Sequence, residues 1–347
     1  MPRVRPLAAF VSFRLGGLDG VAVEAEKWAR ALHALGYATK RVAGEISGDP
    51  QVGDAVVPGL GLTAVEGGPD VRLLRGSLET ADLVIVENLL SLPLNIPAAR
   101  TLTLLLADLA TGRGTRVLMH HHDLPWQREQ FRHIDELPPR IPGAAHVTIN
   151  ELSRTALART EIEATTIYNC FDLDAPPGNR EKARRALCIP DEDLLVVQPT
   201  RAIARKGIPR ALDLTQALAE LLPERTAHLW IAGEAEEGYG PTLDRLVEGA
   251  GVHVLRGTTT WVADMYAASD VVAFPSSWEG FGNPVIESVW AQRPLATSHY
   301  PVLDELLGFG FRFFEVEDPA TLAMHLREPG PALFEDNLAI ARKHFSL

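Results

Sequence analysis

Short apolar runs and segments with apolar residues at helical spacing alternate along the whole chain. The run Leu7–Phe13 is continuously apolar-rich, which is typical of a strand buried on both faces of a parallel sheet. After a glycine-rich turn, apolar residues recur at helical spacing from Val21 to Leu35, with charged residues on the opposite face. The same pattern predicts further strands in this half at residues 83–86, 115–119, 147–149 and 165–167.

The alternation stops at Ala175-Pro-Pro-Gly-Asn179, whose composition is typical of a linker, and restarts beyond it. The pattern in the second half predicts strands at residues 194–198, 228–232, 252–255, 271–274 and 295–297. It predicts helices between them at residues 210–222, 242–249 and 284–291.

Strand–helix alternation of this kind predicts parallel sheets with right-handed crossovers. A chain of 347 residues is long enough for two cores of roughly 150 residues each. We therefore expect an α/β protein with two Rossmann-like, doubly wound domains, residues 1–174 and 175–347, that face an interdomain cleft. Ligands of such sheets bind at the carboxyl ends of the strands, so the turns that follow strands are the places to look for chemistry.

Composition and charge exclude several classes of protein. The net charge of −12 argues against a nucleic-acid partner, because phosphate binding needs a clustered positive field. The most apolar run, residues 102–110, contains Asp108 and is far shorter than a membrane span, so no integral membrane segment is expected. Cys170 and Cys188 do not make a disulfide framework, which favours a reducing, cytoplasmic location.

The segment Trp278–Glu287 directly follows a predicted strand and combines several features of a binding site. Gly280 and Gly282 permit close approach of the backbone to a ligand, and Pro284 is well placed to open a helix. The amides at that helix start suit an anion such as a diphosphate. Glu279 and Glu287 could hold two points of one ligand through sugar hydroxyls. The alternative is a helix cap followed by a surface glutamate.

The sequence of this segment resembles a known signature. Pro275-Ser-Ser-Trp-Glu-Gly-Phe-Gly-Asn-Pro-Val-Ile-Glu-Ser288 is similar to the motif of glycosyltransferase family 4, whose members are retaining enzymes of the GT-B fold. The resemblance implies that Glu279 contacts the hydroxyls of the donor sugar and that Glu287 contacts the ribose of the nucleotide. It also implies that the turn between them lies near the donor sugar and phosphate, with donor-binding residues Gly280, Phe281, Gly282 and Asn283.

A second turn, residues 199–207, follows the first predicted strand of the second half and is basic. Arg201 can bind phosphate oxygens in bidentate fashion, and Lys206 adds a point charge. Together they would stabilise the negative charge on a leaving nucleoside diphosphate without a metal. The alternative is a solvated basic loop, but its position matches the phosphate-binding pair of the family. The family usually has glycine where this chain has Thr200.

The first turn of the chain, residues 15–20, contains Gly16 and Gly17 but does not form the nicotinamide-binding fingerprint. It resembles the double-glycine loop of the family, which implies that Gly16 and Gly17 bind the phosphates of the donor. The alternative is a tight turn that packs a helix on the sheet.

The run His120-His121-His122-Asp123 ends another predicted strand. Alternation places His120 and His122 on one face and His121 on the other. A metal site needs a third ligand at a suitable spacing, and the sequence offers none, so no metal is expected. The alternative to a functional role is a histidine satisfied in the core. In the family a histidine at this place points at the donor sugar; His122 is the best match, and His120 takes its place if the register shifts by two.

Two Asp-x-Asp pairs, Asp172 with Asp174 and Asp191 with Asp193, have the spacing of metal–nucleotide ligands. They lie at the linker and on a polar loop, so we expect them to be solvated.

The family resemblance implies a retaining, metal-independent hexosyltransferase that needs no cofactor. Its partners would be a nucleoside-diphosphate sugar as donor and a hydroxyl acceptor, a small soluble molecule rather than a lipid. The family resemblance implies that the N-terminal domain binds the acceptor and the C-terminal domain the nucleotide sugar, with a short C-terminal segment that crosses back. The alternatives are a GT-B glycoside phosphorylase and a non-catalytic nucleotide-sugar-binding protein. A nucleobase site near Gly257–Trp261 would favour the transferase.

Overall fold

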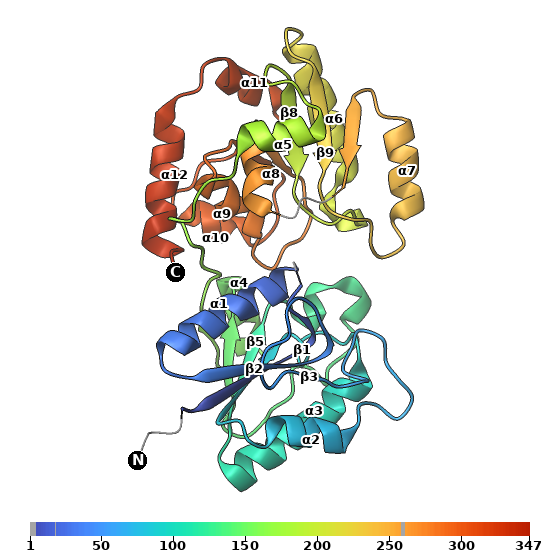
Figure 1. The fold of residues 1–347 in the computed structure, drawn as a ribbon, viewed down its shortest axis with the longest axis vertical. Coiled ribbons are helices and arrows are strands. Elements are labelled where there is room, and N and C mark those ends of the chain that lie inside the picture. The colour runs from blue at the N-terminus through green and yellow to red at the C-terminus, as the bar shows by residue number, and fades with distance from the viewer. Residues whose placement is uncertain (1–4, 18, 258–260) are drawn as a thin grey trace. The chain divides into compact units, whose positions relative to one another are not determined.

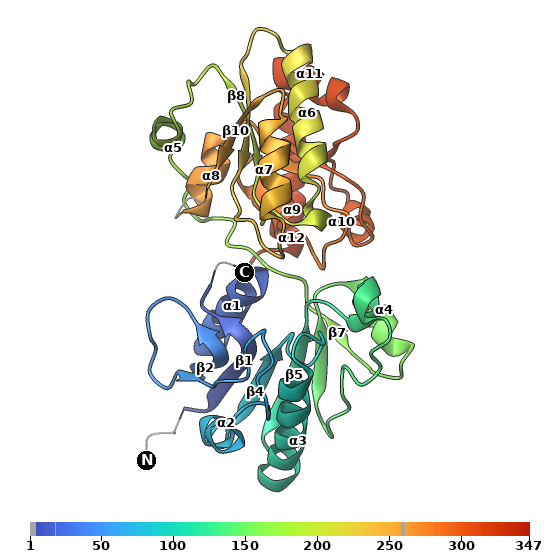
Figure 2. The same cartoon turned by 90° about the vertical axis from the view of Figure 1, so that its right-hand side faces the viewer.

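The computed structural model describes residues 5–17, 19–257 and 261–347. The chain divides into two compact units, unit 1 (Met1–Asn169) and unit 2 (Cys170–Leu347), each an α/β layer structure (Figures 1 and 2). Within the described residues, no helix has both the length and the apolar character that a bilayer crossing requires.

Unit 1 is built on a seven-stranded parallel sheet with strand order β3-β2-β1-β4-β5-β6-β7. Its strands are β1 (Leu7–Leu15), β2 (Ala38–Ile46), β3 (Ala55–Val56), β4 (Leu83–Glu87), β5 (Arg116–His121), β6 (Ala145–Thr148) and β7 (Thr165–Thr166). Its helices are α1 (Gly20–Ala34), α2 (Val71–Leu78), α3 (Ile96–Arg113) and α4 (Glu151–Ala158), with short 3-10 turns at Pro125–Gln127 and Glu129–Phe131.

Strand β1 is apolar on both faces because helices cover both sides of the sheet. Ala9 and Val11 belong to the core that includes α2 and α3, whereas Ala8 and Phe10 pack toward α1. Figure 1 shows α1 on one side of the sheet and α2 and α3 on the other. The uninterrupted apolar run of the sequence therefore has the physical cause expected for a central parallel strand.

Unit 2 is built on a six-stranded parallel sheet with strand order β10-β9-β8-β11-β12-β13. Its strands are β8 (Leu194–Gln198), β9 (Ala227–Ile231), β10 (His253–Arg256), β11 (Val271–Phe274), β12 (Leu295–Thr297) and β13 (Phe314–Glu315). Its helices are α5 (Arg180–Leu187), α6 (Ile208–Leu221), α7 (Gly240–Glu248), α8 (Val262–Ala268), α9 (Asn283–Trp290), α10 (Leu303–Gly308), α11 (Pro319–Arg327) and α12 (Pro331–His344), with a 3-10 turn at Ala204–Lys206.

The last helix of the chain packs within unit 2. Helix α12 lies against α9, and just beyond it Ser346 forms an isolated parallel bridge with Phe171 at the start of the unit. The beginning and the end of unit 2 are thus joined by backbone pairing.

The predicted fold class, two Rossmann-like parallel-sheet α/β domains, is confirmed. Strands β8, β11 and β12 begin and end where the apolar pattern places them. The pattern misses β2 because Lys40 and Arg41 interrupt its apolar run. In the structure both side chains are buried, and Arg41 is held by Asp54 at 2.6 Å. The two-residue edge strands β3 and β13 are too short to give a pattern.

One carboxylate, Asp270, ties together the two strands that carry the central turns of unit 2. It precedes β11, and its Oδ2 accepts a hydrogen bond from the backbone N–H of Leu195 on β8 at 2.8 Å. The same oxygen is 2.6 Å from the guanidinium of Arg184, which is 2% exposed. Arg180 and Arg225 add contacts of 2.8 and 3.2 Å. A buried arginine is tolerated only with such a partner.

Replacing this carboxylate tests the role of the cluster. Asp270→Ala leaves the buried Arg184 charge uncompensated, so we expect the free energy of unfolding to fall by about 3–5 kcal/mol in urea titrations followed by circular dichroism. The control is Asp244→Ala, which removes the partner of Arg256 in an exposed pair and should cost less than about 1 kcal/mol. Equal losses in the two variants would contradict the assigned role.

Candidate functional site

The turns after β8 and β11 of unit 2 are tied to each other at the carboxyl ends of two adjacent strands. The backbone N–H of Ser277 donates to the carbonyl oxygen of Arg205 at 2.9 Å, and the guanidinium of Arg205 donates to the carbonyl of Trp278 at 2.8 Å. The side-chain amide of Gln198 holds the carbonyl of Lys206 at 2.8 Å. Two turns that are far apart in sequence therefore form one surface.

At the centre of this surface, Lys206 and Glu279 form a buried ion pair between Nζ and Oε1. Both residues are less than 10% exposed, and Nζ also lies 5.6 Å from the centroid of the Phe274 ring. Arg205 approaches the second carboxylate oxygen at 3.4 Å. Burial lowers the pKa of Lys206, and the charge of Glu279 opposes that shift. The structure thus brings together two of the residues that the sequence selects independently.

Arg201 lies on the same turn as Lys206 but has a different partner. Its guanidinium is 2.7 Å from the carboxylate of Glu236, with both side chains about one-third exposed. The partner comes from the turn after β9, which reaches this place because Gly233 lies against Thr200. A Cβ on Gly233 would meet the Thr200 carbonyl oxygen at 2.2 Å. Glu236 belongs to no motif, so nothing in the sequence predicts this contact.

The turn that leads into α9, within the segment Trp278–Glu287, is fixed by a tyrosine. Gly282 caps the start of α9 with a left-handed φ of 97°, and a Cβ there would lie 2.4 Å from the hydroxyl of Tyr300. That hydroxyl donates to the carbonyl of Phe281 at 3.1 Å. Phe281 is 2% exposed, and its ring packs against Phe171 and Phe345. The side chain of Phe281 therefore anchors the turn, and its contribution to a ligand would come from the backbone.

Glu287, one turn inside α9, also has a partner that the sequence did not reveal. The hydroxyl of Tyr266 on α8 donates to Oε2 of Glu287 at 2.6 Å. Burial, together with the neighbouring charge of Glu287, raises the pKa of Tyr266 well above its usual range, so the tyrosine stays a neutral donor. The tyrosine therefore holds the carboxylate of Glu287 in one orientation.

Several buried polar atoms of these turns have no hydrogen-bond partner among the described residues. They are Oε1 of Gln198, Oγ1 of Thr200, Oγ of Ser276 and Nε1 of Trp278. Buried polar groups are otherwise nearly always paired, so their concentration at one edge of the sheet is typical of a surface that binds a polar ligand.

In unit 1, Gly16 follows the end of β1 with a left-handed φ of 76°, and a Cβ there would lie 2.1 Å from the carbonyl oxygen of Ser47. Glycine is thus required by the packing of this turn. Asp19 caps α1 by accepting from the N–H of Ala22 at 3.2 Å, and Gly17 lies between Gly16 and this cap. Leu18, within the same loop, falls outside the described residues.

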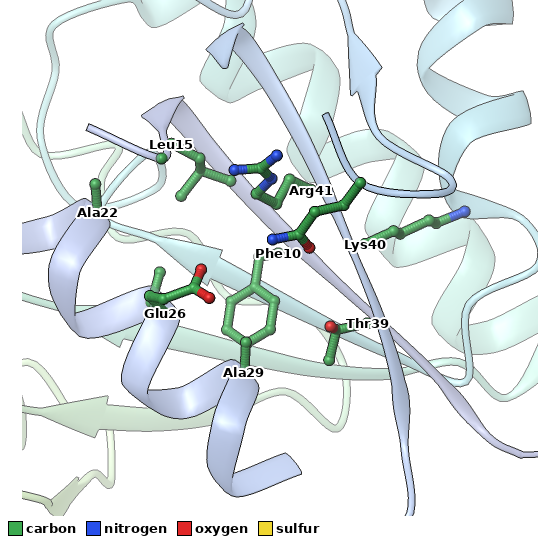
Figure 3. A pocket seen from close by; sticks show the side chains of 11 residues that line it. Phe10, Leu15, Ala22, Glu26, Ala29, Thr39, Lys40 and Arg41 are labelled. Carbon is green, nitrogen blue, oxygen red and sulfur yellow. The ribbon is translucent and has the colours of Figure 1, made fainter. Parts of the chain in front are cut away.

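A pocket lies beside this turn, between α1 and β2. Figure 3 shows Glu26 of α1 and Arg41 of β2 approaching it from different elements, with Phe10 at its base. Its cavity volume is about 10 Å³, which is about the room that one water molecule needs. The pocket is therefore too small for a sugar.

The three histidines of unit 1 separate as strand alternation predicts. Nε2 of His122 lies 2.8 Å from Oε2 of Glu87, and Nδ1 of His120 lies 2.9 Å from the same oxygen. His121 instead contacts Ser91 at 2.6 Å and His146 at 2.9 Å. Burial lowers the pKa of His121 well below its usual range, so it is a neutral member of a core network.

Glu87, at the end of β4, is the residue of this cluster that sequence reasoning missed. It is fully buried. Burial opposes its ionisation, but the charges and close contacts of His120 and His122 outweigh burial and lower the pKa of Glu87 to about 2. Burial also opposes protonation of His122, but the hydrogen bond and charge of Glu87 outweigh it and raise the pKa of His122.

Glu87, His120 and His122 also form the one group of three potential metal-binding side chains found among the residues that the structure describes. Glu87 supplies the third donor that the sequence did not offer. The contact between His122 and the carboxylate, however, already has the distance and geometry of a direct hydrogen bond.

Of the two Asp-x-Asp pairs, Asp172, Asp174 and Asp191 are exposed, and Asp193 is not. Asp174 is 87% exposed on its side chain and pairs with Arg342 at 2.9 Å. Asp191 is 70% exposed, but the expectation of a solvated pair is wrong for Asp193, whose side chain is 14% exposed and lies 2.8 Å from Nε2 of His228.

Comparison with known proteins bears on the fold and on the class of activity. Residues 200–328 match the family described as Glycosyl transferases group 1. The chain is 26% identical to mannosylglucosylglycerate synthase of Thermotoga maritima, in a match that covers 98% of this chain and 96% of that protein. It is similar in structure to HepE of Anabaena in complex with UDP and glucose, with a TM-score of 0.75, 19% identity and coverage of 98% and 96%.

A second solved structure, that of WaaG, a glycosyltransferase involved in lipopolysaccharide biosynthesis, matches with a TM-score of 0.66, 14% identity and coverage of 97% and 94%. The likeness to these structures shows a GT-B fold. The domain match and the relatives support glycosyltransferase activity.

The role of Gly282 can be tested directly. Gly282→Ala places a side chain in a left-handed conformation and against Tyr300, so we expect a loss of at least about 1–2 kcal/mol in the free energy of unfolding. Gly308→Ala in α10, where a Cβ meets nothing within 4 Å, is the matched control and should be neutral or stabilising by up to about 1 kcal/mol. Urea unfolding measures the free energy of unfolding of both variants. Similar losses in the two would mean that the turn at Gly282 tolerates another conformation.

Proposed function

We propose that this chain is a retaining, metal-independent glycosyltransferase of family 4. It transfers a hexose from a nucleoside-diphosphate sugar to the hydroxyl of a small soluble acceptor. The observation that carries the proposal is the buried pair of Lys206 and Glu279 at the carboxyl edge of the unit 2 sheet. Here a fixed cation and a fixed carboxylate lie side by side, next to a helix start and a second cation, Arg201.

The two cations suit the leaving group. When the bond between the anomeric carbon and the diphosphate breaks, negative charge develops on the phosphate oxygens. Lys206, held in a largely dry environment, would stabilise that charge without reorganisation. Arg201 would add a bidentate contact when the diphosphate displaces Glu236, its present partner.

The two carboxylates suit the other parts of the donor. Glu279 is ion-paired with Lys206 and approached by Arg205, so it would serve as a fixed acceptor for sugar hydroxyls. Glu287 is oriented by Tyr266 and would accept hydrogen bonds from the ribose. The backbone of the turn from Gly280 to Asn283 would lie near the sugar and the phosphate, at the positive end of α9.

Retention would follow from attack on the same face that the diphosphate leaves. The acceptor oxygen forms the new bond to the anomeric carbon as the old carbon–oxygen bond breaks, and the acceptor proton passes to an oxygen of the leaving phosphate. Glu279 is a poor candidate for a nucleophile because two cations already hold its carboxylate. In unit 1, the family resemblance assigns Gly16 and Gly17 to the donor phosphates and His122 to the donor sugar.

The relatives suggest which molecules to try. A UDP complex with glucose in HepE makes UDP-glucose a first donor, and the name of the Thermotoga maritima synthase indicates a product that contains mannose, glucose and glycerate. Mannosyl and glucosyl nucleotides should therefore be tried with glucosylglycerate and glycerate as acceptors.

Two other functions use the same residues. A glycoside phosphorylase would use inorganic phosphate at the cations, and a binding protein would hold the nucleotide sugar without turnover. The nucleobase site that would favour the transferase was predicted near Gly257–Trp261, and residues 258–260 lie outside the described residues. Turnover with nucleotide sugars and not with phosphate would exclude both alternatives.

The buried pair gives a mutational test. Lys206→Ala and Glu279→Ala should each lower turnover by about two to three orders of magnitude, since each removes a preorganised contact to the reacting donor. The control is Lys182→Ala, which removes an ammonium that is 72% exposed and should leave turnover unchanged. Circular dichroism establishes that each variant is folded. Turnover near wild type in both site variants would refute the assigned roles.

Nucleotide selectivity and metal-independence can be tested together. Wild-type protein is heated with UDP-, GDP-, ADP- and dTDP-sugars, and one class should raise the Tm and be slowly hydrolysed. Transfer activity should persist in EDTA. No thermal shift with any nucleotide sugar would argue against the transferase, and activity lost in EDTA and restored by a divalent ion would argue against metal-independence.

A further inference from the structure

Unit 1 contains a buried cluster of charged and titratable groups at the carboxyl ends of β4 and β5. Its members are Glu24 and Lys27 of α1, Glu87 of β4, and His120 and His122 at the end of β5. Each is 7% exposed or less. The ring of Trp28 packs on His120 with centroids 4.5 Å apart, which places α1 directly over the pair of histidines. Burying so many charges is costly, so the arrangement needs a reason beyond packing.

Glu87 determines which nitrogen of His122 carries a proton. The carboxylate, whose pKa is lowered to about 2, is ionised at any ordinary pH and can only accept hydrogen bonds. Because Nε2 of His122 lies 2.8 Å from Oε2 in hydrogen-bond geometry, Nε2 must be the donor. His120 contacts the same oxygen at 2.9 Å without hydrogen-bond geometry, so His122 is the histidine that Glu87 orients.

The other nitrogen of His122 remains available. Its Nδ1 makes no hydrogen bond within the described part of the chain and is not among the fully buried unpaired atoms. The side chain keeps 6% exposure. The backbone next to it is fixed as well, because Oδ1 of Asn88 accepts from the N–H groups of both His122 and Asp123 at 3.2 Å. Ring and backbone are thus held so that one nitrogen stays open to a ligand.

We propose that Glu87 is the positioning residue for His122: it holds the ring through Nε2 and makes Nδ1 a charged hydrogen-bond donor to the transferred sugar. The contact between His122 and the sugar belongs to the proposed function, on which this inference rests. The role of Glu87 is new. It replaces the solvent that would otherwise stabilise an imidazolium and leaves the pair of Glu87 and His122 with no net charge.

The charges around His122 favour the same protonation state. Burial disfavours the imidazolium, but Glu87 on β4, Glu24 on α1 and Asp123 after β5 raise the pKa of His122. Lys27 of α1 lies 2.9 Å from Glu24 and partly neutralises it, and Arg128 lies 3.0 Å from Asp123. His120 is the neighbouring titratable group on the same face of β5, and the neutral His121 lies on the opposite face.

The raised pKa of His122 determines how transfer should depend on pH. With a raised pKa, His122 keeps its proton to a higher pH than a free imidazole does, and Nδ1 donates as long as that proton is present. As pH rises through that pKa, Nδ1 loses its proton and becomes an acceptor, so transfer should fall on the alkaline side. Removing the charge of Glu87 leaves burial as the dominant influence, so the pKa of His122 should fall and the alkaline limb should move to lower pH.

The experiment follows His122 itself and does not depend on turnover. Protein labelled with ¹⁵N in histidine is titrated by NMR, and the signals of His122 are assigned by loss in His122→Asn. In the wild type we expect the pKa of His122 to lie above 6.5, with Nε2 protonated throughout. Glu87→Gln, which can still accept the hydrogen bond, should lower that pKa by about 1 or more. Glu87→Asp keeps the charge and should recover part of the loss.

The same variants are then assayed for transfer across pH. For Glu87→Gln, kcat measured above the wild-type pKa of His122 should fall about tenfold for every whole number by which that pKa drops, with KM for the nucleotide sugar little changed. The matched control is Glu66→Gln, an exposed carboxylate on a loop of the same unit, which should change neither profile. Bound metals are measured in wild type and Glu87→Gln by elemental analysis.

The outcomes separate this inference from the proposed function. A wild-type His122 whose pKa is 6.5 or lower, or an unchanged pKa in Glu87→Gln, overturns the role of Glu87 even if transfer is observed. A stoichiometric metal that is lost with Glu87 also overturns it, since the cluster is then a metal site. If the NMR result is as expected but Lys206→Ala keeps full turnover, the failure lies in the proposed function and not in the positioning of His122.

Discussion

The buried contact between Lys206 and Glu279 is the interaction on which the candidate site depends. An ammonium and a carboxylate that are less than 10% exposed need each other as partners. Burying either charge without the other would cost several kcal/mol of desolvation free energy. The two residues are 73 positions apart in sequence. Their pairing therefore requires that the turns after β8 and β11 lie together, and hydrogen bonds of the Arg205 side chain and the Ser277 backbone keep them there.

Close backbone approach makes this pairing possible. Gly207 follows Lys206 in a left-handed conformation, and a Cβ there would lie 2.3 Å from the carbonyl oxygen of Pro275. Gly233, after β9, lies equally close to the backbone of Thr200, and Gly282 lies against the hydroxyl of Tyr300. These glycines let three turns from neighbouring strands converge at one edge of the sheet. The cations and carboxylates are then presented from a rigid framework, as electrostatic stabilisation of a transition state requires.

The sequence predicts the strands of this framework well, but it does not predict which residues pair with the site residues, and the reason is physical. Strands β8 and β11 are buried on both faces, so their apolar runs are visible without knowledge of the fold. Glu236, Tyr266 and Glu87 act only through residues that are at least 21 positions away, and nothing in their local sequence marks them. The apolar pattern misses strand β2 for a related reason. Its Lys40 and Arg41 look solvated until the fold supplies Asp54 and the surrounding burial. The predicted histidine alternation holds because it depends on the strand alone.

The two units share one electrostatic design, which follows from parallel-sheet geometry. Adjacent parallel strands lie about 4.8 Å apart, so side chains from the turns that follow them can come close enough to form an ion pair. In unit 2, Lys206 follows β8 and Glu279 follows the neighbouring β11. In unit 1, Glu87 ends β4 and His122 follows the neighbouring β5. In each case a buried carboxylate fixes the orientation of a basic side chain, so the fold itself holds that side chain in place. Under the proposed function, the donor would meet groups that need no reorganisation, which is a physical reason for costly buried pairs at the carboxyl ends of both sheets.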